Sequence, residues 1–196
     1  MNRANRIVRL EGVTASFPSL FKKTAYKDNK PKYSITALFD PESSAHKVIK
    51  KAFNEILEEL WGGKKPNGLK TCLHDGDAKI ASARNPDTYA SYEGKLYVTP
   101  VSDNLPDVRD RNPTVKLDSE TGAAKIYGGA VLDVIVNLWA WDHPVHGPQI
   151  NCELKGAQFV DAGERIGGGG ETDVSDYFKD YGDGGDASSS SDDDNW

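Results

Sequence analysis

Strict alternation of side-chain character over residues 130–141 is the feature of the sequence that most limits the fold. In a β-strand successive side chains point to opposite faces, so every second residue shares a face. One face of this segment is aliphatic and consists of Leu132, Val134, Val136, Leu138 and Ala140. The opposite face carries Trp139 and Trp141, which are neighbours on that surface. The pattern predicts a strand with its aliphatic face in a core and its tryptophans accessible.

Four further segments have the composition and spacing of strands, and turn residues such as Asn112-Pro113 separate several of them. They are residues 7–16, 32–39, 95–101 and 150–160. A chain of 196 residues with 37% apolar side chains is long enough to bury the core of one ordinary domain. The strands therefore predict a mainly β domain.

One amphipathic helix interrupts the strands. Asp40-Pro41-Glu42 predicts its start, with Asp40 as the N-cap residue and Pro41 in the first helical position. Between residues 45 and 60, apolar side chains recur at the spacing of one helical face, and Gly62-Gly63 marks the end. Five or so strands with one such helix predict an OB-fold-type β-barrel with one long inserted α-helix, which covers one end or face of the sheet.

Residues 167–196 have a different composition and predict a separate C-terminal tail. The segment begins with four glycines, is dominated by Gly, Ser and Asp, and holds one lysine against nine acidic residues. Such a composition buries too little apolar surface to offset chain entropy, so we expect a flexible, disordered acidic tail after a folded domain of residues 1–166. An acidic run followed by a terminal tryptophan predicts a partner-binding end at Asp192, Asp193, Asp194 and Trp196.

The charge is unevenly distributed between these two regions. The chain has 24 basic and 30 acidic residues, but residues 1–166 alone have 23 basic and 21 acidic ones. Residues 1–40 hold eight basic residues against three acidic ones. A basic body with an acidic arm is compatible with a polyanionic partner despite the low overall isoelectric point.

Targeting and redox signals point to an intracellular setting. No apolar run reaches the length of a membrane span, and the start MNRANRIVRL has no apolar block of a secretory signal behind it. Cys72 and Cys152 form no metal-type pair. They are most simply reduced thiols, although the sequence leaves one disulfide open.

Enzyme signatures are nearly absent, since the chain has no GxSxG, GxxxxGK[ST] or HExxH motif. Asp75 and Asp77 could hold Mg²⁺ for phosphoryl chemistry, but a turn between two elements explains the same residues. His143 and His146 predict a hairpin loop rather than a metal site. Cys72 is more simply a structural thiol than a nucleophile. We therefore expect no catalytic residues, no metal and no cofactor.

Basic residues interleaved with aromatic ones give the stronger signal. Unpaired nucleic acid is bound by cations that follow the phosphates and by rings that stack on bases, which every base permits. The residues that fit this pattern are the predicted nucleic-acid-binding set: Lys22, Lys23, Tyr26, Lys27, Lys30, Lys32, Tyr33, Lys64, Lys65, Lys70, Tyr89, Tyr92, Lys95, Tyr97, Arg109, Arg111, Lys116, Trp139 and Trp141. The alternative for each residue is an ordinary core ring or a solvated surface lysine.

The chain resembles the single-stranded DNA-binding proteins of bacteriophages, which have an OB fold. The resemblance rests on short stretches in a fairly specific order and spacing over residues 7–166. They are RLEGVTASFPSLF (9–21), YSITALF (33–39), DGD (75–77), YEGKLYV (92–98), IYGGA (126–130) and GAQFVDAGE (156–164). In the proteins that it resembles, an acidic tail with an aromatic end recruits replication enzymes and competes with DNA for the basic groove. The resemblance implies no catalytic residues.

The resemblance and the residue pattern together predict a protein that binds single-stranded DNA (ssDNA) without sequence preference. It would coat and protect ssDNA in phage DNA replication, recombination or repair, in the cytoplasm of the bacterial host. Its tail would recruit replication or recombination proteins, and a homodimer is a candidate oligomeric state. The alternatives are a metal-dependent nuclease or other phosphoryl-transfer enzyme using Asp75 and Asp77, and a virion or scaffold protein whose tail serves solubility.

Overall fold

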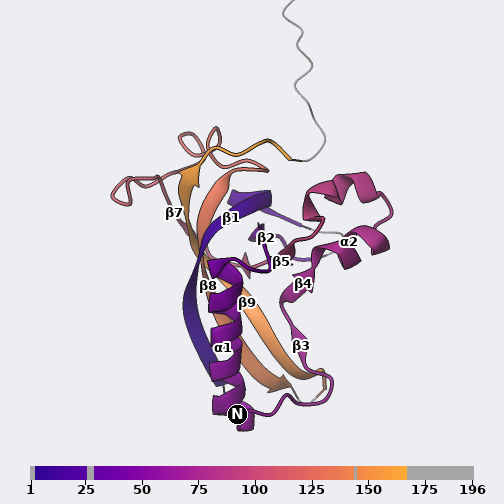
Figure 1. Cartoon of the computed structure of the whole chain (residues 1–196). Coiled ribbons are helices and arrows are strands. Elements are labelled where there is room, and N and C mark those ends of the chain that lie inside the picture. Colours follow the sequence, from indigo (N-terminus) through magenta and orange to yellow (C-terminus); the bar gives the residue numbers. More distant parts are fainter. Residues whose placement is uncertain (1–2, 26–28, 144, 167–196) are drawn as a thin grey trace, which may run out of the picture.

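The computed structural model describes residues 3–25, 29–143 and 145–166, and the fold of this part of the chain is mainly β. The predicted tail, with Asp192, Asp193, Asp194 and Trp196, lies outside the described residues. The strands form one twisted sheet with a long helix packed alongside it (Figure 1). The elements in chain order are β1 (Arg3–Thr24), β2 (Lys32–Phe39), α1 (Ser44–Trp61), β3 (Lys70–Thr71), β4 (Leu73–Asp75), α2 (Gly76–Ser82), η1 (Pro86–Tyr92), β5 (Leu96–Val98), β6 (Val101–Ser102), β7 (Asp107–Arg109), β8 (Val131–His143) and β9 (Gly147–Asp161).

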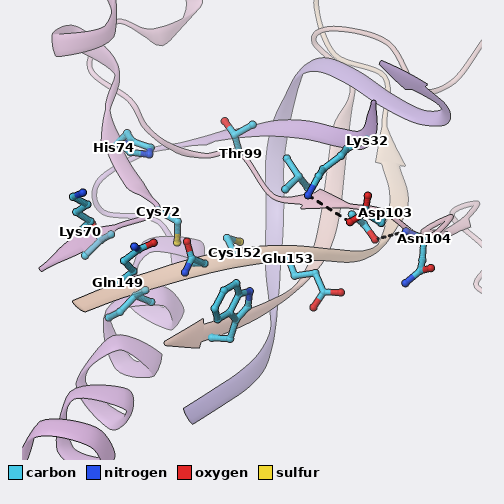
Figure 2. A pocket seen from close by; sticks show the side chains of 16 residues that line it. Lys32, Lys70, Cys72, His74, Thr99, Asp103, Asn104, Gln149, Cys152 and Glu153 are labelled. Carbon is cyan, nitrogen blue, oxygen red and sulfur yellow. Dashed lines mark hydrogen bonds and ion pairs between the residues drawn. The ribbon is translucent and has the colours of Figure 1, made fainter. Parts of the chain in front are cut away.

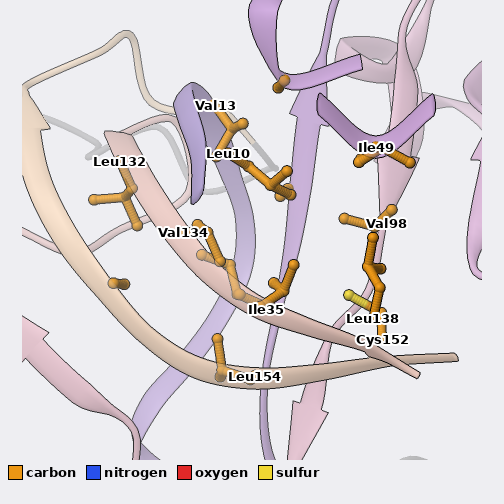
Figure 3. Close-up of a cluster of buried hydrophobic side chains, with 14 of the residues drawn as sticks. Leu10, Val13, Ile35, Ile49, Val98, Leu132, Val134, Leu138, Cys152 and Leu154 are labelled. Carbon is orange, nitrogen blue, oxygen red and sulfur yellow. The ribbon is translucent and has the colours of Figure 1, made fainter. Parts of the chain in front are cut away.

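Strand β8 is central and confirms the predicted strand and its buried aliphatic face, whereas the tryptophans are only partly accessible. It pairs antiparallel with β1 on one side and with β9 on the other. Its aliphatic face is buried throughout, and these side chains meet those of α1, β1, β2 and β9 in the core (Figure 3). Trp139 and Trp141 lie on the opposite face and are half-buried. The predicted hairpin after the tryptophans is also confirmed, because β8 turns directly into its partner β9.

The pairing between strands returns to its starting point. The path runs from β1 through β8, β9 and β6 to β2, and β2 pairs antiparallel with β1 as well. Strand β1 has 22 residues, which is long enough for both contacts. Its register changes three times, between Leu10 and Val13, between Ser16 and Ser19, and between Ser19 and Thr24. Irregularities of this kind bend a strand and redirect its side chains.

Helix α1 follows the predicted periodicity but begins later than predicted. Its N-cap residue is Ser43, whose extended backbone lets Oγ accept a hydrogen bond from the backbone N–H of His46 at 3.3 Å. The prediction of Asp40 as N-cap was wrong, because the Asp40 carboxylate accepts a hydrogen bond from Lys95 at 2.6 Å. The predicted end is confirmed: Gly62 adopts the left-handed conformation and donates its N–H to the carbonyl of Glu58.

The expectation of a single helix was wrong, since α2 and η1 lie between β4 and β5. Each has seven residues, which is too short for an apolar period to stand out in the sequence. The expected strand 95–101 is also divided into β5 and β6, separated by Thr99-Pro100. No helix in the described part of the chain is long and apolar enough to cross a membrane.

Candidate nucleic-acid interface

Two hollows on the sheet adjoin each other and share part of their lining. The larger has a volume of about 980 Å³ and lies over β2, β5 and η1, and the smaller, of about 640 Å³, lies along the edge of β9 (Figure 2). Four residues line both hollows: Lys32, His74, Thr99 and Val101. We call the combined surface the groove.

Aromatic rings gather in the larger hollow, and we call them the ring cluster: Phe17, His74, Tyr89, Tyr92 and Tyr97. Phe17 meets Tyr89 at 6.0 Å between ring centroids, and Tyr89 meets Tyr92 edge to face at 5.2 Å. Tyr92 in turn meets Tyr97 at 5.3 Å, and Tyr97 meets His74 at 5.2 Å. These side chains come from β1, β4, η1 and β5, so only the tertiary fold brings them together.

Phe17 is presented to the groove by an unusual backbone. It lies within the register shift between Ser16 and Ser19 of β1, and its φ of 46° is in the left-handed region that side-chain-bearing residues rarely adopt. Its side chain is nevertheless 52% exposed rather than buried in the core. Strained backbone that exposes a large apolar ring is typical of functional positions, because core packing does not account for it.

Tyr92 forms the floor of the ring cluster. It is buried, and its hydroxyl hydrogen-bonds to Ser16 Oγ at 3.2 Å. Burial raises the pKa of Tyr92, although the hydrogen bonds to Ser16 and Thr36 oppose the shift, and burial likewise raises the pKa of Tyr97. Gly76 lets the start of α2 approach this floor, because a Cβ at that position would lie 2.1 Å from the Tyr92 carbonyl oxygen.

Lysines approach the groove from several elements. Lys79 of α2 places its ammonium group 4.7 Å from the centroid of the Tyr89 ring, and Lys70 of β3 is exposed in the hollow along β9. Lys30 and Lys32 each lie 3.5 Å from one carboxylate, that of Asp103. Desolvation raises the pKa of Asp103, but attraction by the two ammonium groups outweighs it, and the net shift of the pKa is downward.

His74 is held in its neutral form at neutral pH. Desolvation lowers its pKa, and repulsion by Lys79 lowers it further. The side chain lies where the two hollows join, so its charge changes at the middle of the groove. The groove therefore gains positive charge as the pH falls below the ordinary range of histidine.

The structure brings part of the predicted nucleic-acid-binding set together in the groove. The members that line it are Lys30, Lys32, Lys70, Tyr89, Tyr92, Tyr97 and Trp139. Trp139 belongs to the hollow along β9, whereas Trp141 lies further along β8 and is not among the lining residues. Tyr26 and Lys27 lie outside the described residues.

Other members of the set lie away from the groove. Lys23 places its ammonium group 5.4 Å from the centroid of the Tyr33 ring, which packs against the core. Three further lysines of the set are exposed, one in β1 and two in the loop after α1: Lys22, Lys64 and Lys65. In the described part of the chain, none of the three has a carboxylate within 4 Å. Lys95 pairs with Asp40, as described above.

A second basic cluster surrounds β7, and each of its cations pairs with a carboxylate. Arg109 and Lys116 pair with Asp107 at 2.8 and 3.9 Å, and Arg111 pairs with Asp161 at 2.9 Å. Lys125 pairs with Asp110 and lies 5.8 Å from the centroid of the Phe159 ring. We call Arg109, Arg111, Lys116 and Lys125 the β7 cluster.

The sequence reasoning missed several lining residues: Phe17, His74, Lys79, Ser34, Thr36 and Thr99. A signal for some of them was present, because Lys32, Ser34 and Thr36 alternate with Tyr33, Ile35 and Ala37 and so mark the polar face of β2. Phe17 carries no comparable local signal, since its exposure depends on how β1 pairs with β2.

Asp75 and Asp77 are engaged in local structure. Asp75 caps α2 by accepting a hydrogen bond from Ala78 N–H at 3.0 Å, and Asp77 accepts one from Gly94 N–H at 2.8 Å. The expected turn between elements is the junction of β4 and α2. Among residues 3–25, 29–143 and 145–166, no group of three His, Cys, Asp or Glu side chains could hold a metal ion.

Solved structures of other proteins share this fold. The solved structure of the single-stranded DNA-binding protein from bacteriophage Enc34 in complex with ssDNA superimposes with a TM-score of 0.66 at 23% identity, covering 82% of this chain and 89% of that one. A C-terminal truncation of the Enc34 protein matches with a TM-score of 0.63 at 26% identity, covering 82% and 88%. The single-stranded DNA-binding protein gp2.5 of bacteriophage T7 matches with a TM-score of 0.50 at 15% identity, covering 93% and 100%.

The sequence itself matches a protein family along most of its length. No curated protein sequence matches the chain. The model of the family described as the ssDNA-binding protein of Enterobacter phage Enc34, however, matches residues 6–188. The chain therefore belongs to the family of the Enc34 ssDNA-binding protein.

Proposed function

We propose that this protein binds single-stranded DNA in the groove, without preference for sequence. The observation that carries the proposal is the meeting of the ring cluster with Lys30, Lys32, Lys70 and Lys79 in the two adjoining hollows. Family membership and the fold shared with a protein solved in complex with ssDNA support it.

Within the groove, rings hold bases and lysines hold phosphates. Phe17 and Tyr89 offer ring surface in the larger hollow, and Trp139 offers it in the smaller one. Stacking accepts every base because each base has a π face, so rings bind without reading sequence. Lysine is a flexible point charge and follows the phosphates in the same tolerant way.

The fold that supports the groove is an OB-type barrel with α1 inserted between β2 and β3. The closed path of strand pairing through β1, β8, β9, β6 and β2 supports this assignment. The groove lies across the polar face of β2, so bound DNA would cross the outside of the barrel, where sheet edges and loops leave room for bases.

The domain division and the role of the tail are part of the proposal. Residues 1–166 form the DNA-binding domain, and residues 167–196 form an acidic arm that competes with DNA for the groove. The end of the arm, with Asp192–Asp194 and Trp196, recruits replication or recombination proteins. The protein would thus protect ssDNA during phage DNA replication, recombination or repair in the host cytoplasm, and a homodimer is the oligomer to test.

Binding is measured by fluorescence anisotropy of labelled oligo(dT), duplex DNA and RNA across a salt series. We expect tight ssDNA binding whose log affinity falls linearly with log salt at a slope of about −0.7 per phosphate engaged. Absence of ssDNA binding at low salt would refute the proposal and favour a scaffold role. If the protein degrades the oligonucleotide in the presence of Mg²⁺, and the double variant Asp75→Asn with Asp77→Asn does not, the nuclease alternative is favoured instead.

Intrinsic fluorescence tests the position of the DNA on the groove. Trp139 lines the groove, so oligo(dT) should quench the protein's tryptophan fluorescence, and Trp139→Phe should remove most of that quenching. Trp141→Phe is the matched control from the same face of β8 and should retain it. Quenching that survives in Trp139→Phe would place the DNA elsewhere.

A further inference from the structure

The two cysteines of the chain meet at the floor of the groove. Cys72 follows β3 directly, and Cys152 lies in β9, two residues after the last residue that pairs with β3. Both line the smaller hollow, and Figure 2 shows them next to each other. Their side chains interact with each other, although they are 80 positions apart in the sequence.

The local pairing leaves this point of β9 open. β3 pairs with β9 at Gln149 and Ile150, and β6 pairs with it at Glu153. Between these contacts the edge of β9 faces the hollow, and a small molecule that enters the hollow reaches the half-buried Cys72. Cys72 is the residue directly after the last pair between β3 and β9, Thr71 with Ile150, so the chain carries it alongside the stretch of β9 that contains Cys152.

We propose that Cys72 and Cys152 are a reversible thiol–disulfide pair that a peroxide oxidises and that bound ssDNA shields. The shielding rests on the proposed function, because DNA in the groove would cover the hollow. The pair itself rests only on the placement of the two thiols.

Oxidation of the two thiols by hydrogen peroxide proceeds in two steps. The sulfur of Cys72 attacks hydrogen peroxide, the O–O bond breaks, and Cys72 becomes a sulfenic acid with release of one water. The sulfur of Cys152 then attacks the Cys72 sulfur, the S–S bond forms and the S–O bond breaks, and the leaving hydroxide takes the Cys152 proton as a second water. In sum, two thiols and one peroxide give one disulfide and two waters.

The environments of the two thiols suit this order of events. Cys72 is the more accessible of the two, whereas Cys152 is buried against the core. The interaction with Cys72 and burial both raise the pKa of Cys152, so its thiol stays protonated and is a poor first nucleophile. Cys152 is therefore the resolving partner, which acts once Cys72 has been oxidised.

Oxidation of the full-length chain tests the pair. Reduced, dilute protein is treated with hydrogen peroxide and a metal chelator, unfolded in an alkylating agent, and weighed by intact mass spectrometry. We expect loss of two hydrogen atoms, no alkylation, and recovery of both alkylation sites after reduction. Cys72→Ser should instead keep Cys152 alkylatable, and circular dichroism checks that this variant is folded. A persistent dithiol, or a disulfide between two chains, would overturn the inference.

Saturating oligo(dT) tests the shielding. It should slow disulfide formation at least about tenfold, because exchange and oxidation rates depend on access to the sulfur. Anisotropy of the reduced protein measures DNA binding separately. If the reduced protein does not bind ssDNA, the proposed function is refuted. The thiol–disulfide pair is then still tested by the oxidation experiment without DNA. If the reduced protein binds and the disulfide forms at an unchanged rate, the thiols do not lie beneath the DNA, and the shielding is refuted.

Discussion

The groove and the β7 cluster contain the same ingredients in the sequence but differ in how the fold uses them. Both combine several cations with an aromatic ring, and both contributed to the predicted nucleic-acid-binding set. In the β7 cluster each cation has a carboxylate within 4 Å. In the groove, Lys30 and Lys32 share one carboxylate, and Lys70 and Lys79 have none within 4 Å in the described part of the chain.

The difference teaches that tertiary pairing, rather than the number of basic residues, decides which cations are offered to a phosphate. A cation held by a carboxylate must give up that partner before it binds an anion, whereas an unpaired one releases only screening ions. The rings differ in the same sense, since Phe17 is exposed in the groove while Phe159 is partly buried against the core.

The strongest test of this comparison removes rings from the groove. Phe17→Ala combined with Tyr89→Ala should weaken oligo(dT) binding by about 1–3 kcal/mol per ring that stacks on a base. Val115→Ala, which removes an exposed apolar side chain close to the β7 cluster, is the control and should leave affinity unchanged. Anisotropy titrations give both values, and equal affinity for all three proteins would place the bases outside the ring cluster.

Neutralising single cations should separate the two clusters by their salt dependence. Lys70→Gln or Lys79→Gln should reduce the log–log slope by about 0.7, the loss of one phosphate contact. Arg109→Gln and Lys116→Gln should leave the slope unchanged, because Asp107 holds both cations. A slope that falls equally in both clusters would contradict the distinction between paired and unpaired cations.

Removing the shared carboxylate of the groove should have a smaller effect of opposite sign. Asp103→Asn releases Lys30 and Lys32, and we expect ssDNA affinity to rise slightly, because exposed ion pairs of this kind are weak. The gain should shrink at high salt because screening weakens the same pairs. Unchanged or weaker binding at low salt would show that these lysines do not contact phosphates.

The smallest expected effect is a dependence on pH through His74. Its lowered pKa leaves it neutral at pH 7, and a nearby phosphate favours its protonated form. Affinity should therefore rise as the pH falls from 7.5 to about 5.5, below the ordinary pKa of histidine. His74→Gln should abolish this rise at constant ionic strength, and a rise that persists in the variant would assign it to another group.

Features that depend on neighbours in the sequence were predictable from the sequence. The alternation of Leu132, Val134 and Val136 predicted β8 and its buried face, and Gly62 predicted the end of α1. The start of α1 was not predictable in the same way, because Asp40, a good cap by residue type, pairs with the distant Lys95, which lies just before β5.

The sequence by itself determined the strands with clear alternation, the long helix, the acidic composition of the tail and the family. Only the tertiary structure decided which rings and cations form the groove, because Phe17, His74 and Tyr89 come from β1, β4 and η1. It also decided that Cys72 and Cys152 meet, and that Arg111 pairs with Asp161 rather than facing solvent alone. The physical reason is that backbone periodicity is a local property, whereas the approach of distant side chains depends on strand register, turns and packing across the whole domain.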